Sequence, residues 1–172
     1  MADLPLVTDA LIVIRPVAEA DLPALEWEGE YAHYRNVFRY TFEDAQRGER
    51  LMLIAVAGEV VIGQIFIQLH SGNLQYADNQ HRAYLYALRV KAAWQGLGVG
   101  TRLLAEAEAA LWARGFDTAV IAAAKDNPGA RRLYERCGYR TFTEDPGVWH
   151  FPDENGVPAM QAEPCWVMEK KI

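Results

Sequence analysis

The sequence feature that most constrains the fold is a glycine-rich turn between a predicted strand and a predicted helix. Residues 95–101 read Gln-Gly-Leu-Gly-Val-Gly-Thr. Residues 82–90 before the turn alternate in the manner of a strand, and residues 98–115 place their apolar side chains on one helical face. Residues 118–123 then form a short apolar run, typical of a buried strand. A strand–helix–strand unit of this length predicts a right-handed crossover between two neighbouring parallel strands.

Hydrophobic periodicity and turn residues predict the other elements. Strands are expected over residues 11–14, 51–57, 59–70, 139–143 and 165–170, and helices over 19–28, 43–50 and 127–137. Residues 31–42 are expected to be irregular, residues 71–81 to form a loop, and residues 145–163 receive no element. Short hairpins make the outer strands antiparallel. We therefore predict a mixed α/β fold, a mostly antiparallel sheet of about seven strands with a parallel central pair, flanked by about four helices.

Length and composition exclude several classes of protein. A chain of 172 residues predicts a single domain over residues 1–172, and its 51% hydrophobic content excludes a mainly disordered protein. The formal net charge of −6 argues against a nucleic-acid binder, which needs a broad basic face. The most apolar stretch, residues 51–69, is interrupted by glycine, glutamate and glutamine, so no membrane span is expected.

Cysteine and histidine usage predicts a cytoplasmic protein without a metal. Cys137 and Cys165 are too few for a disulfide framework and are expected to be reduced, buried thiols. The first residues lack the basic and apolar regions of a signal peptide. The four histidines show no spacing typical of metal ligands, so no metal site is expected.

The glycine turn has the chemistry of a phosphate site. Amides in the first turn of a helix have no partner within the helix and lie at the positive end of its dipole, so they bind phosphate without lysine or arginine. The alternative is a tight turn whose glycines serve packing alone. A P-loop is excluded because no Gly-Lys-Ser or Gly-Lys-Thr follows. A dinucleotide-binding turn fits badly, because the glycine spacing differs and the strand at residues 118–123 ends without the ribose-binding acid.

In these residues the chain resembles the GNAT superfamily of acyl-CoA-dependent N-acyltransferases. Residues 95–100 match the family pattern Gln/Arg-x-x-Gly-x-Gly/Ala, and residues 88–90 resemble the strand end that precedes it. Residues 127–139 match a second family pattern, Asn-x-x-Ala-x-x-x-Tyr-x-x-x-Gly-Phe/Tyr. Residues 14–16 and 21–22 are similar to the family's first strand and helix. The resemblance covers about residues 11–144.

The resemblance implies where acetyl-CoA, the expected cosubstrate, would bind. In the family it lies where two parallel strands splay apart, here the strands that end near residues 90 and 123. Main-chain groups of Leu88, Arg89 and Val90 would pair with the pantetheine arm. The remaining cofactor-binding residues implied are Gln95, Gly96, Leu97, Gly98, Val99, Gly100, Thr101, Asn127 and Arg131.

The resemblance also assigns a catalytic role to Tyr134. A phenol can protonate the thiolate that leaves when an amine attacks the thioester. Helical spacing places Tyr134 on one face with Ala130, Leu133 and Cys137, pointing inward. The alternative is a core aromatic whose hydroxyl is satisfied within the protein.

Two features leave the function open. Many relatives carry a glutamate as general base on one of the two central strands, and neither strand here has a carboxylate. A water relay, or Glu26, Glu28 or Glu30, could take the place of this glutamate. One alternative function is a non-catalytic acyl-CoA sensor. Another is a nucleotide-binding module that uses only the glycine turn. Aromatic and acidic residues in segments 27–42 and 145–163 suit a cationic amine of a small molecule or peptide, or else they pack a core or a homodimer contact.

Overall fold

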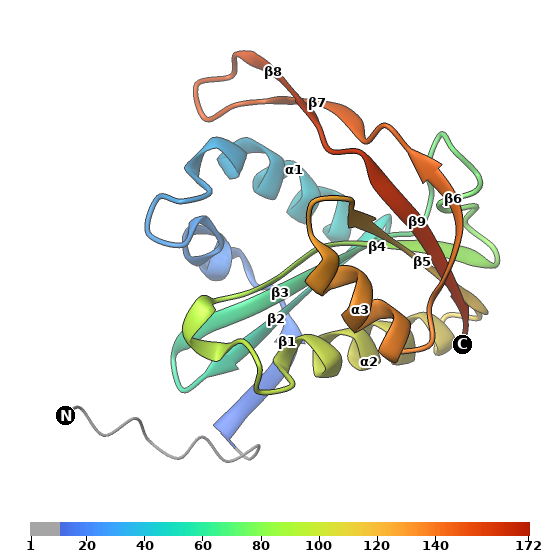
Figure 1. Ribbon diagram of the computed structural model, residues 1–172. Helices are drawn as coiled ribbons and strands as arrows, with labels where there is room; N and C mark the ends of the chain where they lie inside the picture. The colour runs from blue at the N-terminus through green and yellow to red at the C-terminus, as the bar shows by residue number, and fades with distance from the viewer. Residues whose placement is uncertain (1–10) are drawn as a thin grey trace.

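The computed structural model describes residues 11–172 around a seven-stranded sheet of order β1-β2-β3-β4-β5-β9-β6 (Figure 1). Strands β4 and β5 are parallel, and the other neighbours are antiparallel, so the predicted fold class is confirmed. The strands of this sheet are β1 (Ile12–Pro16), β2 (Arg50–Ala57), β3 (Val60–Gln68), β4 (Arg82–Val90), β5 (Thr118–Ala124), β6 (Arg140–Asp145) and β9 (Cys165–Lys171).

Helices cover both faces of the sheet (Figure 1). They are α1 (Arg35–Gln46), α2 (Val99–Trp112) and α3 (Pro128–Arg136), with 3-10 turns η2 (Glu19–Glu26), η3 (Ala32–Tyr34) and η4 (Ala92–Trp94). Helices α2 and α3 pack on one face, and α1 and η2 pack on the other. None of the helices within residues 11–172 is long and apolar enough to cross a membrane.

Helix α2 is held on the sheet by a stripe of fully buried side chains. Leu103, Leu104, Ala107 and Leu111 recur at helical spacing and are at most 1% exposed. Burying each leucine contributes about 1.5–3 kcal/mol, so this stripe fixes the helix against β3 and β4. The start of α2 is therefore placed rigidly beside the end of β4.

Three expectations about local structure were wrong. Residues 19–26 form a 3-10 turn rather than an α-helix, because Pro23 lies inside it and Trp27 ends it with a φ of 47°. The α-helix that follows covers Arg35–Gln46 rather than residues 43–50. The residues expected to be irregular include Phe38 and Thr41, which are buried at helical spacing in α1.

The segment left unassigned is a separate hairpin. Strands β7 (Val148–Pro152) and β8 (Pro158–Ala162) pair with each other and not with the main sheet. Figure 1 shows this hairpin extending beyond β6 and β9 along the side of α1. The contact is specific, since the Asn36 side-chain amide donates to the Asp153 carbonyl at 2.6 Å. Both cysteines are free thiols; Cys165 is buried, whereas Cys137 is only half-buried.

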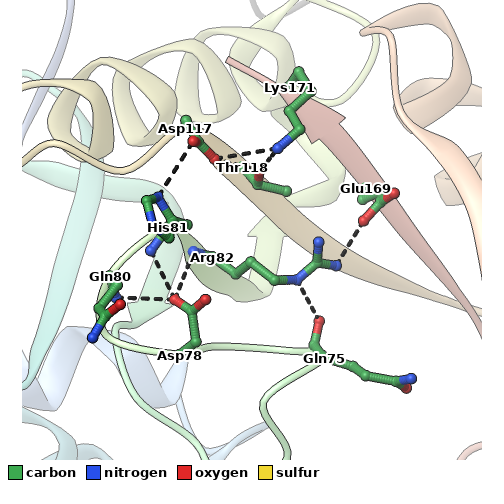
Figure 2. Close-up of polar contacts among 9 residues, drawn as sticks. All are labelled: Gln75, Asp78, Gln80, His81, Arg82, Asp117, Thr118, Glu169 and Lys171. Carbon is green, nitrogen blue, oxygen red and sulfur yellow. Dashed lines mark hydrogen bonds and ion pairs between the residues drawn. The ribbon is translucent and has the colours of Figure 1, made fainter.

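A polar network ties together the first residues of β4 and β5 and the end of β9 (Figure 2). The Arg82 guanidinium donates to the Glu169 carboxylate at 2.6 Å, which joins β4 to β9. The Lys171 ammonium donates to the Thr118 hydroxyl at 2.7 Å, and that hydroxyl donates to the Asp117 carboxylate at 2.7 Å. The network fastens the three strands at the end of the sheet where β4 and β5 are paired.

Asp78 organises the loop that leads into this network. One of its carboxylate oxygens accepts the backbone N–H groups of Gln80, His81 and Arg82 at 2.8–2.9 Å (Figure 2). Burial would raise the pKa of Asp78, but the three donated hydrogen bonds outweigh it and lower the pKa to about 2. The carboxylate therefore contributes stability when ionised.

We expect Asp78→Ala to lower the free energy of unfolding by about 1–2 kcal/mol at pH 7, as for the loss of a cap. The folded-state pKa lies below the ordinary value near 3.9, so this stability is present above pH 4 and is lost as the pH falls through 2. Urea unfolding of Asp78→Ala, Asp78→Asn and the parent protein, carried out from pH 7 to pH 2, measures this contribution to the free energy of unfolding. An Asp78→Ala deficit that stays constant over this range contradicts the role of the ionised carboxylate.

Candidate active site

Strands β4 and β5 are paired at one end and separate at the other. Their parallel register runs from the Arg82–Thr118 pair to the Leu85–Ile121 pair and stops there. Each strand continues beyond this point, β4 to Val90 and β5 to Ala124, without pairing to the other. One row of main-chain donors and acceptors on β4 is therefore not used by β5. Leu88, Arg89 and Val90, singled out from the sequence, lie in this separated part.

A β-bulge accounts for the separation. Phe66 on β3 pairs with Tyr86, but Gln64, two residues earlier, pairs with Arg89, so β4 has one extra residue here. Ala87 takes up the difference with a φ of 52°, and its carbonyl accepts a hydrogen bond of 3.3 Å from the Gln64 side-chain amide. A bulge bends its strand and increases the local twist, which turns β4 away from β5.

The glycine turn connects the end of β4 to α2 and leaves the helix start open. Gly96 and Gly98 have φ values of 74° and 82°, which favour glycine. Gly98 is the residue before the helix, and no side chain of the described residues caps this end. A Cβ atom on Gly98 would meet nothing within 4 Å. The Gln95 side-chain amide donates to the Val90 carbonyl at 2.9 Å, which ties the turn to β4.

The other residues of the turn differ in what they expose. Leu97 and Thr101 are exposed, whereas the Val99 side chain is buried in the core, so Val99 can offer a ligand only its main chain. At Gly100 a Cβ atom would lie 3.4 Å from the Leu133 side chain. This third glycine therefore lets α2 approach α3 closely.

Tyr134 points from α3 into the protein, as its helical spacing predicts. Its side chain is only 6% exposed, and Ala130, Leu133 and Cys137 pack against the same core. No hydrogen bond from the described residues reaches the Tyr134 hydroxyl, and burial alone raises its pKa to about 12. The hydroxyl is therefore protonated at neutral pH and available to a ligand, unlike that of Tyr139, which donates to Glu108 at 2.9 Å.

Asn127 and Arg131 lie at the start of α3. The Asn127 side-chain oxygen accepts the backbone N–H of Ala130 at 3.1 Å, so it caps the helix. The Arg131 guanidinium pairs with Glu135 at 3.1 Å and lies 4.8 Å from the centre of the Trp166 ring. These contacts give both residues structural roles that do not depend on a ligand.

The opposite face of the separated strand is covered by aromatic side chains. Tyr34 lies 5.5 Å from Trp149 and 5.1 Å from Phe151 between ring centres, and its hydroxyl donates to Gln161 of β8. The β7–β8 hairpin thus packs over the aromatic residues of η3 and α1, which brings segments 27–42 and 145–163 together.

Two of the acidic residues expected on this face are engaged in ion pairs, whereas Glu30 forms none with the described residues. Glu26 pairs with Arg35 at 2.7 Å, and Glu28 pairs with Lys91 at 3.2 Å. Arg89, by contrast, is half-buried and places its guanidinium carbon 3.8 Å from the centre of the Tyr31 ring. The role of the Arg89 side chain was missed from the sequence, although an arginine directly after the apolar residues 83–88 was the available signal.

Two surface hollows lie away from the glycine turn and the separated end of β4, although the second is lined in part by Glu26, Arg35 and Phe38. One, of about 350 Å3, is lined by residues such as Asp44 and His70. The other, of about 450 Å3, lies between η2 and α1. Within residues 11–172, no group of three or more histidine, cysteine, aspartate or glutamate side chains is placed to hold a metal ion.

Comparison with known structures finds the same fold in several acetyltransferases. Ard1 from Thermoplasma volcanium has a TM-score of 0.72 at 13% identity, over 94% of this chain and 98% of that chain. A ribosomal-protein-alanine N-acetyltransferase from Brucella melitensis has a TM-score of 0.69 at 20% identity, over 93% and 99%. A spermidine N-acetyltransferase SpeG chimera from Vibrio cholerae and hSSAT has a TM-score of 0.68 at 14% identity, over 94% and 95%.

Comparison of the amino-acid sequence with known proteins and with models of protein families identifies the family. None of the curated proteins compared with the chain matches it. The model of the acetyltransferase (GNAT) family matches residues 17–139, which include the separated end of β4, the glycine turn and Tyr134. The chain therefore belongs to the GNAT family of acetyltransferases.

Proposed function

We propose that the protein transfers an acetyl group from acetyl-CoA to a primary amine of a small molecule or peptide. The observation that carries this proposal is the separation of β4 from β5 beside the uncapped start of α2. An unpaired strand edge suits an extended arm with amide groups, and open helix amides suit a diphosphate. The residues present thus fit acetyl-CoA, which supplies an acetyl group activated as a thioester.

The main chain of this site carries out most of the binding. Leu88, Arg89 and Val90 offer their free edge to the pantetheine arm, and an amide there polarises the thioester carbonyl as it gains negative charge. The amides of residues 96–101 hold the diphosphate, with Gln95 fixing the turn. Asn127 and Arg131, at the start of α3, are proposed to contact the same coenzyme.

Tyr134 acts as the general acid. Its hydroxyl donates a proton to the sulfur that leaves when the amine attacks, so that the thiol rather than the thiolate departs. Its pKa of about 12 keeps the proton in place at neutral pH, and no described residue competes for it. Direct attack requires that the amine and acetyl-CoA are bound to the protein at the same time.

The amine loses its proton to water rather than to a side-chain carboxylate. Neither β4 nor β5 carries a carboxylate, and Glu26 and Glu28 are held in ion pairs, which leaves Glu30 as the alternative to water among the three glutamates considered. A deprotonation through water makes the rate rise with pH until the amine is neutral. The same missing carboxylate favours the second candidate function, a non-catalytic sensor of acyl-CoA in the cytoplasm.

Calorimetry followed by a thiol-release assay tests the proposal. Acetyl-CoA and coenzyme A should bind, whereas ATP and NAD should bind at least ten times more weakly, because they lack the pantetheine arm. Thiol release is then measured with polyamines, amino acids, aminoglycosides and peptides. Binding without turnover of any amine supports the sensor, and failure of acetyl-CoA to bind overturns both functions.

A further inference from the structure

Three buried polar atoms without a hydrogen-bond partner in residues 11–172 gather on one face of the sheet. They are Trp27 Nε1, Gln64 Oε1 and Arg89 Nε. The Trp27 ring lies 5.2 Å from the centre of the Tyr31 ring, and the Arg89 guanidinium carbon lies 3.8 Å from it. Gln64 is the register partner of Arg89, so the two side chains share a face. Because each such group is destabilising by about 1–3 kcal/mol when left unpaired, their gathering indicates a binding site.

The charge of this cluster is positive. No carboxylate among the described residues pairs with Arg89, whereas Lys91, two residues along, pairs with Glu28 at 3.2 Å. The rings of Tyr31, Tyr34 and Phe38 surround the Arg89 guanidinium at 3.8–5.8 Å. Burial lowers the pKa of Arg89, although the Tyr31 hydroxyl opposes the shift. Arg89 is half-buried, and Glu30 acts on it electrostatically without forming an ion pair. A cation removed in part from water and left without an ion pair is destabilising, so an anion from outside the chain would relieve it.

The direction of the Arg89 side chain assigns this cluster to the acceptor substrate and not to the coenzyme. Leu88 and Val90 pack on the core beneath α2 and α3. Arg89, between them, points to the opposite face, where the rings of Tyr34 in η3 and Phe38 in α1 lie beside it and the β7–β8 hairpin packs on Tyr34. Its guanidinium is therefore separated by the sheet from the start of α2, where the diphosphate is proposed to bind.

We propose that this cluster binds a carboxylate group of the acceptor, so that the substrate is an amine that also bears a carboxylate, such as an amino acid or a short peptide. The proposal rests on the proposed function and names the substrate class of its site. Arg89 and Trp27 supply N–H donors to the carboxylate, and the Gln64 carbonyl oxygen accepts an N–H from the substrate. A carboxylate is the anion that a desolvated guanidinium binds most directly.

This assignment replaces the expectation of a cationic amine held between acidic walls. Of the three glutamates considered for this face, Glu26 pairs with Arg35 and Glu28 pairs with Lys91, whereas Glu30 is in no ion pair with the described residues. A polyamine would bring a second positive charge next to the half-buried Arg89, and like charges repel strongly in a site of low polarity. The aromatic rings remain suitable for the apolar part of an amino acid.

Matched pairs of amino acids and dipeptides, each with its carboxyl-terminal amide, test the proposal in the thiol-release assay. The parent protein should prefer the free carboxylate about tenfold or more in kcat/KM. Arg89→Gln should reduce the ratio of kcat/KM for carboxylate over amide about 30-fold or more, as expected for losing a hydrogen bond between charged groups. Arg89→Lys should retain part of the preference, and Lys91→Gln, the matched control, should leave the ratio as in the parent protein.

Two outcomes would overturn the proposal. In one, Arg89→Gln lowers kcat/KM equally for both members of a pair, which is the result of a purely structural arginine. In the other, the parent protein prefers the amide or a polyamine. If no amine releases thiol, the proposed function fails, and tryptophan fluorescence titration with the same pairs decides the carboxylate site separately. The free carboxylate should then bind at least ten times more tightly than the amide, and Arg89→Gln should remove the difference.

Discussion

Replacing Tyr134 with phenylalanine should lower kcat about 100-fold, the contribution typical of general acid catalysis, while coenzyme A binds with nearly unchanged affinity. The hydroxyl has no partner in the described part of the chain, so the loss removes no structural hydrogen bond. The deficit should be largest below the pKa of the coenzyme thiol and should shrink above it, where the thiolate leaves without a proton. Steady-state thiol release from pH 6 to pH 10 and calorimetry with coenzyme A measure both effects.

Tyr139→Phe is the matched control for this experiment. Its ring lies 6.2 Å from that of Tyr134, and it is equally buried, but its hydroxyl donates to Glu108. Removing that bond should lower the free energy of unfolding by about 1–2 kcal/mol and leave kcat within about twofold. A kcat for Tyr134→Phe that matches that of Tyr139→Phe would exclude Tyr134 from acid catalysis.

The second large effect is expected at the start of α2. Gly98→Leu should weaken coenzyme A binding about 10- to 100-fold, because a side chain would occupy the space in front of the helix amides and displace one or two of their hydrogen bonds. The positive φ of Gly98 adds strain of about 1–2 kcal/mol, which lowers thermal stability. Calorimetric titration with coenzyme A measures the affinity.

Gly115→Leu separates the two consequences. Gly115 lies just beyond the other end of the same helix, has a φ of 86° and also has open space around its Cβ position. It should therefore show the same loss of thermal stability with no loss of affinity. Equal affinities for Gly98→Leu and Gly115→Leu would place the diphosphate elsewhere.

Periodicity predicted the elements whose contacts are local and failed where tertiary contacts decided. The alternation in residues 82–90 and the apolar stripe of α2 follow from the sequence alone, since each repeats at the period of its element. Most of helix α1 was missed because aromatic residues such as Phe38 and Phe42 have no strong helix propensity. Their packing on β2, together with the packing of Tyr34 before the helix on the β7–β8 hairpin, stabilises the helix. Residues 145–163 were unassigned because their strands pair only with each other.

The backbone part of the candidate site could be predicted, but its side-chain part could not. Glycine spacing marks an open helix start because only particular residues allow that turn, and Asn127 marks a cap for a similar local reason. The charge on Arg89 is visible in the sequence, but its lack of a counter-ion is not. Whether Glu28 pairs with Lys91 or with Arg89 depends on how η2 and β4 meet.

The sequence by itself determined the parallel crossover, the glycine turn and the inward face that carries Tyr134, because these depend on residues close together in the chain. Only the tertiary structure decided where β4 parts from β5 and which charges remain unpaired around Tyr31. The physical reason is that a bulge and an ion pair each join segments distant in the chain, here β3 with β4 and residue 28 with residue 91. Their energies depend on the register of the strands and on the burial of the charged groups, and no pattern within a short stretch of sequence determines either.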